Sequence, residues 1–244
     1  MRRHRLLHLP VYGRTQHQTK SLTISSDAVM MNRMVESTVG EIAYRQLRGA
    51  LKTGRYAPGQ RLVEPDVIAE LGVTRLALRE AFARLEHEGL VERRANRGVA
   101  VRLLSLAEAV EVLEVRSVVE GLAARHAAVH ATAEDVVALR ATLEKFGRSL
   151  SVPDLSACAA AQARLHELVT VISQLPTAAW LSEMLSAQSA QTRLRTLLVG
   201  DRLRESLDEH KAIVAAIAAH DSDAAETAMR RHLANVTQAV AAAT

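Results

Sequence analysis

The 244-residue sequence contains a single cysteine, Cys158, so no disulfide can form within the chain. This favours a reducing compartment, and the sequence predicts a cytoplasmic protein. No apolar run reaches the roughly 18 residues that a transmembrane helix needs, so no membrane partner is expected. Aromatic residues make up only 2% of the chain, and there are five prolines. The cores must therefore consist of leucine, valine and alanine, which favours a mostly α-helical fold.

Charge is distributed unevenly along the chain. The net charge is +4, but residues 1–20 contain five basic and no acidic residues, whereas residues 104–244 contain 13 basic and 17 acidic ones. A basic front and an acidic back suit a protein in which one half contacts phosphates and the other does not. Residues 1–35 show no apolar period, so we expect a disordered basic tail there.

Residues 36–103 have the pattern of a winged helix-turn-helix, with the helix-turn-helix itself at about 64–83. Apolar residues recur at helical spacing over 38–53, and Glu64 is expected to cap a second short helix that ends at Gly72. Thr74 is the expected cap of a third helix of about 14 residues. Gly89 then leads into a hairpin, in which Gly98 supplies the backbone angle that the turn needs.

The third helix has a core side and an outer side. At about 100° per residue Leu78 and Leu85 share the core side, while Arg75 and Arg79 share an exposed flank. Two arginines near a helix N-terminus suit guanine and phosphate contacts in the major groove. The predicted DNA contacts are Thr74, Arg75, Leu76 and Arg79 on the helix and Arg94, Arg97 and Gly98 on the hairpin.

The run LKTGRYAPGQRLVEPDVIAELGVTRLALREAFARLEHEGLVERRANRGVAV resembles the GntR family of bacterial transcription regulators. The segment EVLEVRSVVEGLAARHAA resembles the start of the FCD ligand-binding domain of the FadR subfamily. Two positions depart from the family pattern. Pro65 stands where relatives often have a phosphate-binding arginine, and Leu76 where Thr or Ser is more usual. The resemblance therefore implies this fold with an operator sequence of its own.

Residues 104–244 predict an all-α bundle of six helices, near 105–130, 132–149, 153–173, 177–199, 202–219 and 222–241. His210 and His232 each lie 11 residues from the turn at Asp221, so an antiparallel helix pair places them at the same height. Both lie in apolar stripes, and a metal ion accounts for two facing buried imidazoles. The alternative is that they are hydrogen-bonded core histidines without a metal.

The FCD resemblance assigns His166, His210 and His232 to the three histidines of the family's metal site. The family's aspartate position falls on Gln162, a weaker neutral ligand, so Gln162 is at most a weak fourth ligand of a Zn2+ ion. Arg116 lies beside the apolar stripe of its helix. It either pairs with Glu120 one turn later or binds an effector carboxylate.

Together these features predict a homodimeric, sequence-specific DNA-binding regulator and not an enzyme. By resemblance it is a repressor of a palindromic operator, and a small organic acid bound near the metal modulates its DNA affinity. Two alternatives remain at this point. One is a metal-free regulator whose helical domain only dimerises, and the other is a three-histidine metal-dependent hydrolase, which would leave the front domain unexplained.

Overall fold

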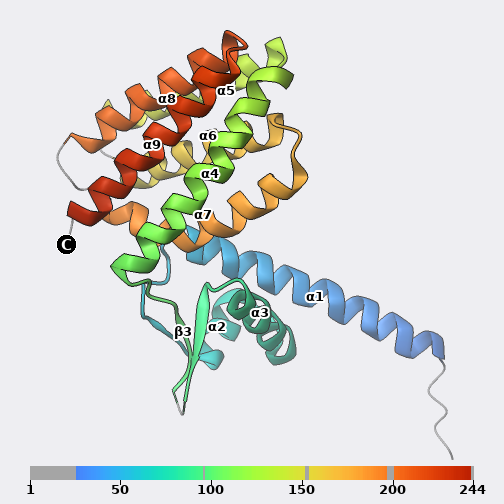
Figure 1. Cartoon of the computed structure of the whole chain (residues 1–244). Helices are drawn as coiled ribbons and strands as arrows, with labels where there is room; N and C mark the ends of the chain where they lie inside the picture. The colour runs from blue at the N-terminus through green and yellow to red at the C-terminus, as the bar shows by residue number, and fades with distance from the viewer. Residues whose placement is uncertain (1–25, 96, 152–153, 197–200, 243–244) are drawn as a thin grey trace, which may run out of the picture. The chain divides into compact units, whose positions relative to one another are not determined.

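The computed structural model describes the backbone of residues 26–95, 97–151, 154–196 and 201–242. It describes the side chains of residues 39–95, 97–151, 154–190 and 201–242. Residues 38–244 form one compact unit, which contains a winged helix and a bundle of helices (Figure 1). No helix in the described part is long and apolar enough to cross a membrane.

The first helix, α1 (Ser26–Lys52), starts earlier than expected. The sequence predicted a disordered tail over residues 1–35, of which residues 1–25 lie outside the described part; residues 26–35 are helical, so that expectation was wrong for them. Ala, Met and Glu are strong helix formers, and no proline or glycine occurs between Ser26 and Gly40 to stop the helix. The missing apolar period therefore did not indicate the absence of a helix.

The winged helix continues with β1 (Arg61–Leu62), α2 (Glu64–Leu71), α3 (Arg75–His87), β2 (Val91–Arg94) and β3 (Gly98–Val101). The three strands form an antiparallel sheet in the order β1-β3-β2. The hairpin was predicted, whereas β1 was not. A strand of two residues is too short to show alternation.

The core of the winged helix lies between α1, α3 and the sheet. The side of α3 that was predicted to face inward is buried, and Gly72 ends α2 in the left-handed conformation, with φ of 64°. Side chains that are almost completely buried here are Leu47, Leu78, Phe82, Leu85 and Val101.

The bundle consists of α4 (Leu106–His130), α5 (Ala133–Ser151), α6 (Leu155–Ile172), α7 (Pro176–Thr196), α8 (Arg202–Ala218) and α9 (Ser222–Ala242). These bounds agree with the six predicted helices to within a few residues. The predicted breaks at Pro153 and Gly200 lie outside the described residues. Helices α8 and α9 pack side by side, as do α4 and α9 (Figure 1). Fully buried alanines on α4, among them Ala124, Ala127 and Ala128, allow α4 to pack closely within this core.

Helix α7 belongs to the bundle but also contacts the winged helix. Ala187 is buried within the core of the winged helix. The next residue, Gln188, donates a hydrogen bond of 2.7 Å from Nε2 to the backbone oxygen of Glu88, which is the C-cap of α3. Arg48 on α1 forms ion pairs both with Glu88 and with Glu183 on α7. The end of α3 is therefore tied directly to α7.

Candidate nucleic-acid interface and metal centre

The N-terminus of α3 presents an exposed basic edge. Thr74 is its N-cap, and its side chain accepts a hydrogen bond of 3.2 Å from the backbone nitrogen of Ala77. Arg75, Leu76 and Arg79 are exposed beside it, with Leu76 52% exposed although it is a large apolar residue. An exposed leucine between two arginines is unfavourable in water but suits contact with the methyl group of thymine.

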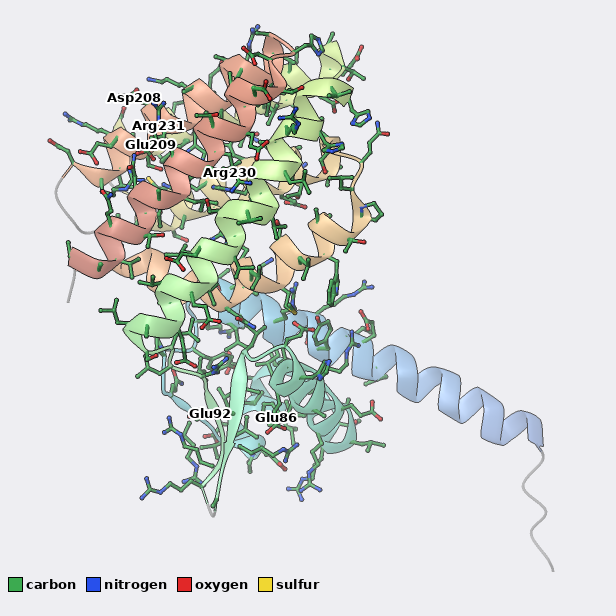
Figure 2. All side chains as sticks on the ribbon, in the orientation of Figure 1. Glu86, Glu92, Asp208, Glu209, Arg230 and Arg231 are labelled. Atoms are coloured by element: carbon green, nitrogen blue, oxygen red, sulfur yellow. The ribbon has the colours of Figure 1, made fainter. Side chains whose placement is uncertain are left out.

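The β2–β3 hairpin forms a second basic edge. Gly98 has φ of 77°, which is the angle expected for it, and Arg94 and Arg97 are exposed near the tip. Arg94 forms an ion pair of 2.7 Å with Glu92, two residues earlier on the same face of β2. Glu92 and Glu86, which pairs with Arg93, are labelled in Figure 2.

Glu64 has a different role from the predicted one. The N-cap of α2 is Val63, without a side-chain hydrogen bond, and Glu64 lies in the first turn of the helix. Its side chain cannot serve as the cap because it points to α3: Oε1 lies 3.3 Å from Nε of Arg79 and Oε2 lies 3.8 Å from Nε of Arg75. Glu64 is thus shared between the two arginines of the predicted recognition helix.

The three predicted histidines meet inside the bundle. His166 comes from α6, His210 from α8 and His232 from α9, and one nitrogen of each lies within 4.8 Å of the others. The Nε2 atoms of His166 and His210 are 3.2 Å apart, and the ring centroids of His210 and His232 are 4.3 Å apart. Residues up to 66 positions apart in the sequence thus form one cluster.

Each ring has an acceptor at Nδ1. His166 Nδ1 lies 2.5 Å from Glu120, His232 Nδ1 lies 2.6 Å from Glu209, and His210 Nδ1 lies 2.6 Å from the backbone oxygen of Ser206. An imidazole that donates from Nδ1 has its lone pair on Nε2. All three rings are therefore held with Nε2 as the ligating atom, which is the arrangement that carboxylates impose on metal-binding histidines.

An arginine holds each of the two carboxylates. Arg116 donates to Glu120 at 2.7 Å, and Arg202 contacts Glu209 through both terminal nitrogens at 3.0 and 2.7 Å. Burial alone raises the pKa of Glu120, but Arg116 and His166 outweigh it and hold the pKa well below its usual range. Burial is likewise outweighed at Glu209, where His232 and Arg202 lower the pKa to about 2. Both carboxylates are therefore ionised at neutral pH.

Two of the histidines are neutral in the absence of a ligand. Burial lowers the pKa of His232 to about 4 despite the hydrogen bond that His232 donates to Glu209, and burial lowers the pKa of His210 well below its usual value. Neutral imidazoles with inward lone pairs are the form that binds a divalent metal ion. The donor set therefore fits such an ion.

Gln162 lies next to the cluster without joining it. It is buried, and its Nε2 donates to the Ser206 hydroxyl at 3.2 Å; that hydroxyl lies 3.3 Å from Nδ1 of His210. A side-chain amide can bind metal only through its oxygen. In this orientation Gln162 instead contacts Ser206 and supports His210 through that hydroxyl.

Two family models match the chain. The model described as "Bacterial regulatory proteins, gntR family" matches residues 40–101, and the "FCD domain" model matches residues 111–235. The chain belongs to the GntR family. It is a GntR-family transcription regulator whose second domain is an FCD domain, as the sequence predicted.

Similar proteins with names of transcription regulators support this placement of the GntR regulator. It is 31% identical to the probable D-xylose utilization operon transcriptional repressor of Paenarthrobacter nicotinovorans, over 83% of this chain and 88% of that protein. It is 29% identical to the HTH-type transcriptional repressor RspR of Escherichia coli strain K12, over 83% and 89%. The solved structure of E. coli McbR/YncC has the same fold, with a TM-score of 0.73 at 21% identity, and the match covers 82% of this chain and 93% of that one.

Arg116 is paired in the structure of this GntR regulator. It is buried and forms the intrahelical pair with Glu120, one of the two arrangements that the sequence left open, and donates to Ser189 on α7 at 2.9 Å. The sequence did not predict the hydrogen bond of His232 to Glu209 or the ion pair of Glu209 with Arg202. Glu209 immediately precedes His210 and Arg202 lies seven residues earlier, so helical spacing puts Arg202 and Glu209 on one face, but nothing in the sequence pairs them with α9.

Proposed function

We propose that this GntR-family regulator represses transcription by binding a palindromic operator as a homodimer, and that metal and a small organic acid in its FCD domain modulate the binding. The observation on which the regulated part rests is the cluster of three Nε2 lone pairs at the centre of the bundle. The two relatives named as repressors support the sign of the effect.

DNA recognition involves the two basic edges. Arg75, Leu76 and Arg79 would face base edges in the major groove, and Thr74 would contact a phosphate near the helix N-terminus. Arg94, Arg97 and the backbone at Gly98 would lie along the adjacent minor groove or its phosphates. Most of the affinity would come from phosphate contacts, which makes binding strongly dependent on salt.

The metal ion would be held by His166, His210 and His232, with Zn2+ as the proposed ion because it commonly binds neutral imidazoles. Three protein ligands leave a coordination position, where a bound metal provides a positive centre for an effector carboxylate. Gln162 could supply a fourth, weak ligand only by turning its amide oxygen inward, away from the arrangement with Ser206.

A pocket beside the cluster has the size of an effector site. It has a volume of about 670 Å³, lies between α6 and α7, and includes His166, Glu120 and Trp180 in its lining. Ser182 also lines it, and among the described residues its buried hydroxyl has no hydrogen-bond partner. A buried hydroxyl without a partner favours a ligand or water that satisfies it. Arg116 is not in this lining, so we propose that it acts on the effector through Glu120 and not by direct contact.

A continuous set of contacts leads from the cluster to helix α7. His166 is bonded to Glu120, Glu120 to Arg116, and Arg116 to Ser189. A metal ion that draws Nε2 of His166 inward would also reposition the Glu120 carboxylate and, through Arg116, the side chain on α7.

The preceding residue on α7 reaches the recognition helix, because Gln188 is bonded to the backbone of Glu88 at the end of α3. The histidine cluster and α3 are therefore both connected to α7, the cluster through Ser189 and α3 through Gln188. This connection supports a coupling in which metal or effector shifts the preferred placement of α3.

An apolar stripe on α4 supports the homodimer. Val115, Val118, Leu122 and Val129 follow each other at helical spacing, and each is more than two-fifths exposed. Such a stripe on a surface helix favours contact with a second copy, whose stripe is the same.

The hydrolase alternative is not supported. Among the described residues the two carboxylates nearest the cluster, Glu120 and Glu209, are each bonded to Nδ1 of a histidine and held by an arginine. Neither is placed as a general base for a metal-bound water. The proposal is tested by selecting an operator from random-sequence duplexes and measuring its affinity by fluorescence anisotropy with and without Zn2+. An absence of any selected sequence would contradict it.

A further inference from the structure

Glu64 is an acidic residue in the middle of a surface that must approach DNA phosphates. It lies in the first turn of α2 and its side chain is 30% exposed. A carboxylate there repels phosphate, so on electrostatic grounds alone it weakens DNA binding. Its position between Arg75 and Arg79 gives it a second effect.

The carboxylate contacts both arginines through the same atom of each guanidinium. Oε1 accepts a hydrogen bond of 3.3 Å from Nε of Arg79, and Oε2 lies 3.8 Å from Nε of Arg75. Within the described part of the chain, the terminal nitrogens of these two arginines make no hydrogen bond or ion pair, since both contacts with Glu64 are through Nε. Two like charges four residues apart on a helix repel, and Glu64 lies where it offsets that repulsion.

This geometry leaves free the end of each guanidinium that reads guanine. The two terminal nitrogens of arginine donate to O6 and N7 of guanine in a bidentate contact. An arginine held at Nε by a carboxylate keeps this end directed outward and loses less side-chain freedom when it binds.

We propose that Glu64 is a positioning residue for sequence recognition: it fixes Arg75 and Arg79 for base contacts, and it increases the difference between operator and unrelated DNA while lowering affinity for DNA in general. The neighbouring Pro65, which fixes its own backbone angle, holds the start of α2 and hence the origin of this side chain. The proposal rests on the proposed DNA recognition through α3, concerns the DNA-binding domain alone and is independent of metal and effector.

The test compares Glu64→Gln with a matched control on the same helix. Asp66 is exposed, also lies in the first turn of α2, and has no ion pair among the described residues, so Asp66→Asn removes the same charge from nearly the same place. Affinities of the full-length dimer for a selected operator and for an unrelated duplex of equal length are measured at several salt concentrations.

We expect Glu64→Gln to weaken operator binding by about tenfold, the loss typical of one impaired bidentate contact, while binding to unrelated duplex is unchanged or tighter. Asp66→Asn should tighten both modestly and to the same extent. Glu64→Asp, which keeps the charge but is one methylene shorter, should give intermediate specificity. The salt slope should stay the same, because the number of phosphate contacts does not change.

A double variant separates positioning from general destabilisation. If Glu64 acts through Arg79, adding Glu64→Gln to Arg79→Gln should cost much less operator affinity than Glu64→Gln costs in the wild-type background. Thermal unfolding of each variant checks that it is folded, and the Glu64→Asp series replaces the Gln series if the latter unfolds. Equal tightening of operator and unrelated duplex by Glu64→Gln, as with Asp66→Asn, would overturn the proposal.

Discussion

The Nε2 atoms of His166 and His210 lie 3.2 Å apart, and each ring faces an oxygen acceptor at Nδ1. When both neutral rings donate from Nδ1, both Nε2 atoms carry lone pairs. Two lone pairs at this distance repel each other unless a cation lies between them. The pair is therefore the strongest single indication of a metal ion in the FCD domain.

Removing His210 should strongly weaken metal binding. We expect His210→Ala to weaken Zn2+ binding at least about a hundredfold, as isothermal titration would show, since only two of the three imidazoles remain. The wild-type protein should also melt at a higher temperature with Zn2+ than without, by the linkage of binding to folding, and the variant should not. The exposed His87, outside the cluster, provides the matched control His87→Ala. Equal Zn2+ affinity in the wild type and His210→Ala would contradict the assignment.

A carboxylate at position 162 should strengthen the site. Gln162→Asp adds a charged oxygen ligand at the position where the FCD resemblance implies an aspartate, and we expect more than about tenfold tighter Zn2+ binding. The same variant should be less stable than the wild type without metal, because a buried carboxylate then has no partner. Gln162→Asn, which is equally short but neutral, separates charge from length. Zn2+ affinity that is the same in all three proteins would show that position 162 does not face the metal.

The connection through α7 should be separable from metal binding itself. Gln188→Ala removes the hydrogen bond to the backbone of Glu88 at the end of α3 without touching the histidines. We expect unchanged Zn2+ affinity, but a smaller change in operator affinity upon addition of Zn2+ than in the wild type. The exposed Gln238 on α9 is far from this contact in sequence and supplies the control Gln238→Ala. If both variants retain the full Zn2+ effect, the signal does not pass through Gln188.

The apolar stripe on α4 should be a dimer interface. Leu122→Glu places a charge in its middle, and we expect the dimer to dissociate at micromolar concentration in sedimentation velocity runs. Operator binding should weaken with it, because one half-site is then bound at a time. Glu114 lies on the same helix and is already exposed, so Glu114→Gln should leave the dimer intact. A variant Leu122→Glu that sediments like the wild type would place the dimer contact elsewhere.

Much of this fold was predictable because its local signals agree. Thr74, Gly72 and the apolar period of α3 indicate the same element, and the six helices of the bundle are separated by clear breaks. The three histidines could be brought together from their helical positions and the family resemblance.

What could not be predicted depends on contacts between distant segments. Glu64 was predicted to cap α2. A glutamate at the start of a helix can cap the helix or pair with a cation on another element, and only the packing of α2 on α3 distinguishes the two roles. Glu209 and Arg202 support His232 across two helices, a relationship without any fixed sequence spacing. The helix over residues 26–35 was missed because it has no apolar period.

The most direct test of the central claim, that this chain reads DNA through α3 and the wing, is the salt dependence of operator binding. With the wild-type protein and the selected duplex, we expect log Kd to rise steeply with log salt, by about 0.9 for each phosphate contact. Arg75→Ala with Arg79→Ala should abolish the preference for the operator. Weak binding that is indifferent to salt, with both arginines intact, would contradict the account.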